Sequence, residues 1–142
     1  MNDFVHLTFN ASSDNEQFIR TAASAFALRL NPTVQDIYEV KTIVSEAVTN
    51  CIIHAYEENK EGVIEVQMSI QDDEMNIYIK DFGCGIDDIE QAMEPMYTSK
   101  PEKERSGLGF SIMQQFSDDM TVKSGKGEGT EIRIKKKIKK EE

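Results

Sequence analysis

The chain has 142 residues, of which 39% are hydrophobic and 30% are charged, values typical of one soluble domain large enough to bury a core. The formal net charge of −10 argues against direct DNA binding, which needs a basic surface. No apolar run approaches the length of a membrane span, and "MNDFVHLTF" lacks the features of a secretory signal. We therefore expect a single cytoplasmic domain over residues 1–142, without a membrane segment.

Two local features of the composition are the cysteines and the C-terminal lysines. Cys51 and Cys84 lie in different predicted elements without metal-ligand spacing, so we expect reduced thiols, with Cys84 an incidental small residue. The segment "IRIKKKIKKEE" holds six of the sixteen basic residues. We interpret it as a last strand with a solvated end, and the alternative is a docking patch for an acidic partner.

The first half of the chain predicts one strand followed by two helices. "HLTFNAS" alternates apolar and polar residues like a short strand, and residues 14–30 carry apolar side chains at helical spacing. "NPT" at 31–33 breaks this helix, and a longer helix is predicted from about Val34 to Tyr56. The apolar stripe of the longer helix consists of Ile37, Val40, Val44, Ala47, Val48, Cys51 and Ala55.

The second half predicts four strands and one helix. "VIEVQMSIQ" and "MNIYIKD" alternate cleanly, and the polar "QDDE" between them fits a hairpin. A polar region with Pro95 and Pro101 follows, then a helix from Leu108 to about Phe116, then strands "DMTVKS" and "TEIRIKKKI" around "GKGEG". This order predicts an α+β two-layer sandwich, with helices on one face of a mixed, mostly antiparallel sheet.

The predicted long helix carries a line of polar residues in the stretch "SEAVTNCIIHAY". Glu46, Asn50 and His54 recur every four residues, so at about 100° per residue they share one side of the helix, away from the main apolar stripe. Ile43 and Ile53 flank this line, so its side is not simply open to water. The pattern suggests a ligand cleft above the helix, and the alternative is an ordinary polar stripe with hydrogen bonds inside the helix.

A second motif, "KDFGCGID", follows a predicted strand. Asp81 keeps the parity of the apolar residues before it, so its carboxylate should point toward the packed face, which is costly without hydrogen-bond donors. Gly83 and Gly85 allow the backbone to turn sharply and approach a ligand closely. A planar base with an exocyclic amine would suit this carboxylate, and Thr130 in the last strand is expected to point inward by the same parity.

A third motif, "SGLGFSIMQQF", places two glycines at the start of an amphipathic helix. Unobstructed backbone amides and the positive end of the helix dipole favour phosphate there, although such a turn is weak support by itself.

Two short motifs resemble those of other nucleotide-binding proteins but are misleading. "DFG" also occurs in eukaryotic-type protein kinases, but this chain has no H-R-D loop and is far too short. "GKGEG" looks like a dinucleotide loop, but a strand follows where a helix would be required.

Taken in order, E-x-x-x-N, D-x-G-x-G, the glycine-opened helix and G-x-G-T before a final strand form a specific combination. The combination resembles the GHKL (Bergerat) ATP-binding fold shared by gyrase, heat-shock chaperones, histidine kinases and mismatch-repair proteins, over Asn10 to Lys137. It is closest to the short anti-sigma serine kinases, whose helix motif is similar to "EAVTNxxxHAY". Among these it looks most like the sporulation anti-sigma factors of spore-forming Gram-positive bacteria.

The resemblance implies roles for the motif residues toward ATP and Mg²⁺. Asn50 would hold Mg²⁺ through its side-chain oxygen, and Glu46 would deprotonate the attacking serine hydroxyl. Asp81 would accept the adenine amine, and Arg105 would help neutralise the transferring phosphate. The other implied nucleotide contacts lie in the glycine loop, in a mobile lid around residues 87–106, at the helix start and in the last strand: Gly83, Gly85, Thr98, Lys100, Ser106, Gly107, Leu108, Gly109 and Thr130.

The resemblance also implies two linked activities. As an anti-sigma factor, the protein would bind an RNA polymerase sigma factor, and as a serine kinase it would phosphorylate and inactivate an anti-anti-sigma protein. A homodimer is implied, with a hypothetical dimer and partner surface that includes the first strand and the N-terminal helix with Arg20. Two alternatives remain: a histidine-kinase-type catalytic domain, and an ATP-dependent binding switch without phosphoryl transfer. For His54 we expect a structural hydrogen-bonding role.

Overall fold

The computed structural model describes residues 2–57, 59–83, 109–125 and 127–138. None of the helices in these residues is long and apolar enough to cross a membrane. The elements, in chain order, are β1 (Asn2–Asn10), α1 (Ser13–Ala27), the 3-10 helix η1 (Leu28–Leu30), α2 (Val34–Asn50), the π-helix η2 (Cys51–Ala55), β2 (Val63–Gln71), β3 (Glu74–Asp81), α4 (Gly109–Phe116), β4 (Asp119–Gly125) and β5 (Gly129–Lys137).

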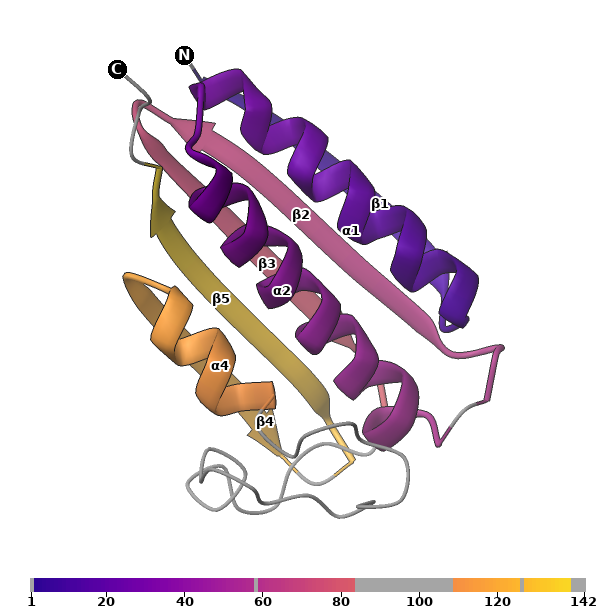
Figure 1. The fold of residues 1–142 in the computed structure, drawn as a ribbon. Helices are drawn as coiled ribbons and strands as arrows, with labels where there is room; N and C mark the ends of the chain where they lie inside the picture. The colour runs from indigo at the N-terminus through magenta and orange to yellow at the C-terminus, as the bar shows by residue number, and fades with distance from the viewer. Residues whose placement is uncertain (1, 58, 84–108, 126, 139–142) are drawn as a thin grey trace.

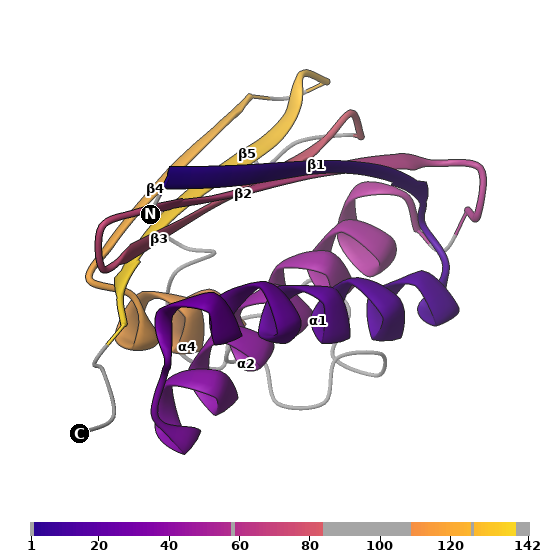
Figure 2. The ribbon, with the colours of Figure 1, turned by 90° about the horizontal axis from the view of Figure 1, so that it is seen from above.

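The strands form one open sheet in the order β1-β2-β3-β5-β4, and α1, α2 and α4 cover one of its faces (Figure 1, Figure 2). This confirms the α+β two-layer sandwich. All four pairings are antiparallel, so the mixed pairing that we expected is not found among the described strands. The reason is that β3 and β4 run in the same direction but are separated by β5.

The core lies between the sheet and the helices. β2 and β3 bury every second side chain, as the alternation in the sequence predicted. Ile64 and Ile79 on the sheet, and Val40 and Val44 on α2, are each at most 1% exposed. Fully burying such a side chain stabilises the fold by about 1.5–3 kcal/mol, so α2 is held against the middle of the sheet.

The long helix begins where the sequence predicted but changes character before its end. Thr33 caps α2 in a capping box: its hydroxyl accepts from the Asp36 backbone N–H at 3.0 Å, and the Asp36 carboxylate accepts from the Thr33 N–H at 3.3 Å. The predicted α-helix to about Tyr56 ends at Asn50, and Cys51–Ala55 form a π-helix. π-helical turns are rare and occur frequently at functional sites.

The interpretation of the C-terminal lysines as a solvated strand end is wrong for Lys136. This residue is 4% exposed because it shares the inward parity of Ile132 and Ile134 on β5. Lys135 and Lys137 have the opposite parity and are exposed, which leaves the docking-patch alternative untested for them.

Candidate functional site

The C-terminal half of α2 and the start of α4 lie against each other. A Cβ atom added to Gly109, the first residue of α4, would lie 3.2 Å from both Asn50 Nδ2 and Glu46 Oε2. Glu46 and Asn50 are themselves half-buried, as the flanking Ile43 and Ile53 predicted. The glycine therefore lets the α4 backbone approach the polar line of α2 more closely than a side chain would allow.

Asn50 has an unsatisfied hydrogen-bond donor in this contact. Its Nδ2 is buried and has no hydrogen-bond partner in the described part of the chain. An unmade hydrogen bond at a buried donor costs about 1–3 kcal/mol. An anionic ligand between α2 and α4 would supply the missing acceptor, so the donor set at this position fits a phosphate group.

The carboxylate of Asp81 lies inward at the end of β3, as its strand parity predicted, and the residue is 3% exposed. Its Oδ1 accepts two backbone hydrogen bonds, from Gly83 N at 3.0 Å and from Thr130 N at 3.2 Å. Its Oδ2 lies 3.6 Å from the thiol of Cys51. Burial raises the pKa of Asp81, and the hydrogen bonds from Gly83, Cys51 and Thr130 oppose that rise.

The thiol of Cys51 is a buried group beside this carboxylate. Burial raises the pKa of Cys51 well above its usual value, and the charge of Asp81 adds to the rise. The thiol therefore stays protonated and can donate to Asp81 Oδ2. Because Cys51 directly follows Asn50, this contact also brings the Asp81 end of the site next to the Asn50 end.

The turn after Asp81 is held by the end of the long helix. A Cβ on Gly83 would overlap the carbonyl oxygen of Ala55, so glycine is required there for close packing against η2. The Tyr56 hydroxyl accepts from the Phe82 N–H at 2.7 Å and donates to the Val63 carbonyl oxygen. These contacts fix the backbone on both sides of the D-x-G turn.

The β5 side of the site depends on a hairpin glycine and a hydroxyl pair. Gly129 has a φ of +79°, and a Cβ there would overlap the Asp81 carbonyl oxygen, so no other residue fits well. Thr130 is 7% exposed, which confirms its inward orientation. Its Oγ1 lies 2.8 Å from Ser124 Oγ, which also donates to the Gly129 carbonyl at 2.9 Å.

The structure thus brings six of the predicted site residues to one end of the sandwich, where β3 and α2 end and β5 and α4 begin (Figure 1). The six are Glu46, Asn50, Asp81, Gly83, Gly109 and Thr130. The remaining predicted residues lie outside the described residues, as does the predicted lid at 87–106: Gly85, Thr98, Lys100, Arg105, Ser106, Gly107 and Leu108. Cys84 lies outside them too.

Three contributors to this end of the molecule were not predicted from the sequence. Cys51 was assigned to the core alone, and neither Ser124 nor Tyr56 was considered as a site residue. Ser124 could have been found from the hairpin register, since it pairs directly with Thr130. His54 is half-buried, and its expected structural role stays a prediction.

A metal ion at this site would depend on few protein ligands. The described residues contain no group of three His, Cys, Asp or Glu side chains that could hold a metal. Magnesium that is bound mainly by substrate phosphates needs only one or two protein oxygens. The side-chain oxygen of Asn50 fits that requirement, because it lies on the side of α2 that faces Gly109.

The fold and this arrangement define a nucleotide-binding domain of the histidine kinase-like type. A family model described as "Histidine kinase-like ATPase domain" matches residues 9–136. Among solved structures, RsbU and RsbW domains of a Mycobacterium tuberculosis protein align with a TM-score of 0.69 at 16% identity, covering 96% of this chain and 32% of that one. The catalytic domain of histidine kinase ThkA aligns with a TM-score of 0.58 at 14% identity, covering 96% of each chain. At these identities the two structures show the fold alone.

Closer relatives identify the family more narrowly. The anti-sigma F factor of Clostridium beijerinckii is 52% identical over 132 residues, which is 93% of this chain and 92% of that protein. The anti-sigma F factor of Bacillus velezensis is 46% identical over 140 residues, 99% of this chain and 96% of that protein. The chain belongs to the anti-sigma F factor family.

Proposed function

We propose that the protein is an anti-sigma factor that is also an ATP-dependent protein serine kinase. It would bind an RNA polymerase sigma factor, keep it from the polymerase, and phosphorylate a serine of an anti-anti-sigma protein so that this protein cannot displace it. The names of its relatives support the first activity. The observation that carries the second is the contact of Glu46 and Asn50 with the glycine that opens α4.

The Asp81 end would bind the adenine base. With Oδ1 held by two backbone amides, Oδ2 would accept the exocyclic amine of adenine, and the adjacent thiol of Cys51 would keep the carboxylate oriented. The inward hydroxyl of Thr130 would lie beside the base, held by Ser124. Recognition of an amine by a buried carboxylate would favour adenine over bases with a carbonyl at that position.

The Asn50 end would bind the triphosphate and Mg²⁺. Asn50 would offer its side-chain oxygen to the metal and its Nδ2 to a phosphate oxygen, which would satisfy the donor that has no partner among the described residues. The bound metal would neutralise charge on the phosphates. The first amides of α4, together with the segment before it, would donate to the phosphates at the positive end of the helix dipole.

Glu46 would act as the general base. Its carboxylate lies on the same side of α2 as Asn50, one turn earlier, and on the Gly109 contact. It would accept the proton of the substrate serine as the serine oxygen attacks the γ-phosphorus and ADP leaves. Arg105 would balance the charge that develops on the transferring phosphoryl group.

The partner contacts are proposed on a different part of the molecule. We expect a cytoplasmic homodimer, and place the dimer and partner surface on β1 and α1, including Arg20. The guanidinium of Arg20 is partly exposed and lies 3.7 Å from Glu16 one turn away, an arrangement that leaves it accessible to a partner carboxylate.

A transfer assay tests the kinase activity. The purified protein is incubated with γ-labelled ATP, Mg²⁺ and the purified anti-anti-sigma protein, and acid-stable label on serine is expected. Glu46→Gln should keep ADP affinity and lose transfer, because a base is needed for transfer and not for binding. Glu61→Gln, at an exposed loop carboxylate, serves as the matched control and should behave as wild type.

Other outcomes of the same assay decide between the alternatives. Acid-labile label would favour a histidine-kinase-type reaction, because phosphoramidates are lost in acid. Nucleotide binding without any transfer would favour the binding switch. If Glu46→Gln also lost ADP binding, the assignment of Glu46 as the base would be wrong. Size-exclusion chromatography with the purified sigma factor, with and without ATP and Mg²⁺, tests the anti-sigma activity.

A further inference from the structure

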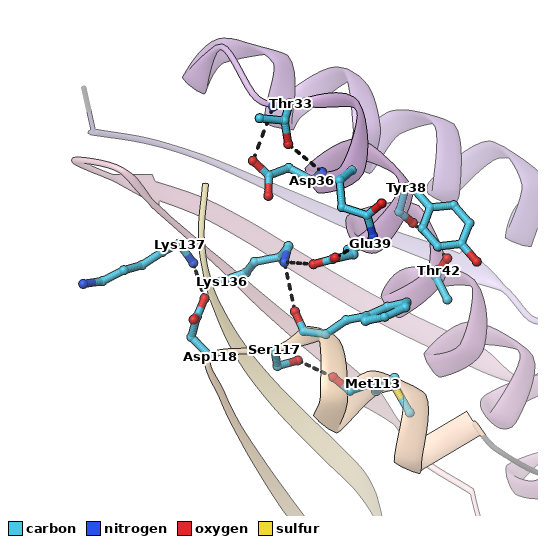
Figure 3. Close-up of polar contacts among 12 residues, drawn as sticks. Thr33, Asp36, Tyr38, Glu39, Thr42, Met113, Ser117, Asp118, Lys136 and Lys137 are labelled. Atoms are coloured by element: carbon cyan, nitrogen blue, oxygen red, sulfur yellow. Dashed lines mark hydrogen bonds and ion pairs between the residues drawn. The ribbon is translucent and has the colours of Figure 1, made fainter. Parts of the chain in front are cut away.

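Lys136 places a buried cation between α2, α4 and β5. Its ammonium group donates to Glu39 Oε1 on α2 at 2.6 Å and to the backbone carbonyl oxygen of Phe116, the last residue of α4, at 2.9 Å. The Lys136 side chain is 5% exposed. Figure 3 shows it pointing from β5 toward Glu39, whereas the side chain of Lys137 points away.

The contacts at the two ends of α4 show how this helix lies along α2. Gly109, at its first residue, meets Glu46 and Asn50. Phe116, at its last residue, packs edge-to-face on Tyr38 with ring centroids 6.0 Å apart. The start of α4 therefore meets the end of α2, and the two helices run antiparallel. Seven residues of helix, about 10 Å, separate the Lys136 contact from Gly109.

Apolar packing alone would fix the position of α4 along its own axis only loosely. Between its two ends α4 buries Met113 completely, and methionine adapts easily to small displacements. The hydrogen bond from Lys136 to the last carbonyl is directional, and its cation complements the negative end of the helix dipole. The last turn of α4 contains no basic residue of its own, so Lys136 supplies the charge from β5.

Because Lys136 also pairs with Glu39, its hydrogen bond to the Phe116 carbonyl fixes the end of α4 relative to α2 as well as to β5. A buried ammonium needs a paired carboxylate to stay charged, and Glu39 Oε1 is that partner. Glu39 and Glu46 are seven residues apart, two turns of the same helix. The cation thus connects the end of α4 to the side of α2 that carries Glu46 and Asn50.

We propose that Lys136 is a positioning residue for phosphate binding, acting through α4 rather than on the nucleotide itself. By tying the last carbonyl of α4 to Glu39, it sets how far the helix lies along α2. It thereby sets where the Gly109 end stands relative to Glu46 and Asn50. A two-turn helix is stiff, so a shift at one end reaches the other. This inference rests on the proposed nucleotide site at the Gly109 end.

Binding of two ligands separates positioning from a purely structural role. Calorimetric titrations with ADP plus Mg²⁺ and with adenosine are compared for wild type, Lys136→Met and the control Lys137→Met, a neighbouring exposed lysine. Lys136→Met should weaken ADP binding about tenfold, since small displacements of binding groups cost about that much or more. It should leave adenosine binding unchanged, because the Asp81 end does not depend on α4. Lys137→Met should match wild type for both ligands.

A second variant covers the case in which Lys136→Met does not fold. The double variant Glu39→Gln, Lys136→Met removes the unpaired carboxylate together with the cation and should show the same selective loss of ADP affinity. Hydrogen exchange without nucleotide should be faster in residues 109–116 of either variant than in wild type. Equal loss of ADP and adenosine affinity, or loss of neither, would overturn the inference.

The outcome for the proposed function can be read separately. Wild-type protein that binds ADP but transfers no phosphate would refute the kinase activity and leave the inference about Lys136 standing. Wild-type protein that binds neither ligand would refute both.

Discussion

Replacing Asp81 with asparagine should weaken base recognition without destabilising the fold at neutral pH. The side-chain oxygen of asparagine can keep the two backbone bonds that Oδ1 accepts from Gly83 at 3.0 Å and Thr130 at 3.2 Å. On the Oδ2 side, however, an amide donor replaces an acceptor. A hydrogen bond to a charged group contributes about 1.5–3 kcal/mol, so the dissociation constant for ADP should rise about 10- to 150-fold.

The pH dependence of stability follows from the raised pKa of Asp81. Burial raises that pKa, so the folded state holds the Asp81 proton up to a higher pH than the unfolded chain does. The contribution of Asp81 to stability is therefore fully present below the pKa of an unfolded aspartate, and it is lost as the pH rises through the raised folded value. At pH 7 the variant, which has no charge to bury, should melt at a temperature equal to or above that of wild type. The two should converge in acid.

Thermal melts at pH 7 and at about pH 3.5, below the usual pKa of an unfolded aspartate, with calorimetric ADP titrations at pH 7, test both parts of this prediction. Asp73→Asn, at an exposed turn carboxylate, is the matched control and should change neither property. An Asp81→Asn protein that binds ADP within twofold of wild type would refute the role of Asp81 toward the base. A variant that melts below wild type at pH 7 would refute the argument that burial of the ionised carboxylate is costly.

Three further substitutions test the packing around the site. Gly109→Ala should weaken ADP binding up to about tenfold in a calorimetric titration, because a Cβ 3.2 Å from Asn50 Nδ2 and Glu46 Oε2 displaces both groups. The melting temperature should not fall, because alanine favours a helix more than glycine does. Unchanged ADP affinity would show that α4 has room to move. Tyr56→Phe should lower the free energy of unfolding in urea by about 1–3 kcal/mol, because the hydroxyl bonds to Phe82 N and to the Val63 carbonyl are both lost; no loss would mean that water replaces them. Met113→Ala should cost about 2–5 kcal/mol in the same assay, since this side chain is fully buried under α4, and a smaller cost would indicate that the helix collapses onto the space.

Local patterns in the sequence predicted the strands and the orientation of the groups that they carry. The period-two alternation in "VIEVQMSIQ" predicted a strand that the structure places at the same residues, 63–71. The same parity predicted that Asp81 and Thr130 point inward, as their exposures of 3% and 7% confirm. Parity also applies to Lys136, where the charge of the residue led us to expect solvent. The alternation along β5 already placed Lys136 on the packed face, and we did not foresee that the half-buried carboxylate of Glu39 would pair with it.

Contacts between distant elements were beyond the reach of these patterns. The approach of Cys51 to Asp81 joins residues thirty positions apart and depends on how the end of α2 is seated over β3. The π-helix at Cys51–Ala55 was not predicted, because nothing in the residue types there distinguishes it from an ordinary α-helix. The antiparallel packing of α4 on α2 likewise depends on contacts made at both ends of α4.

The polar line on α2 is costly for stability, and that cost is an argument for a ligand. Asn50 keeps Nδ2 buried with no partner among the described residues, at a cost of about 1–3 kcal/mol. An aliphatic residue in place of Asn50 would remove the cost of the unpaired donor. It could pack beside Ile53, which is buried, with only 9% of its surface exposed. An anionic ligand would remove it equally well by accepting from Nδ2, and Gly109 keeps the α4 backbone clear of any side chain at that contact. The same group that weakens the free fold therefore strengthens binding, so nucleotide should raise the stability of this end of the sandwich more than that of β1 and α1.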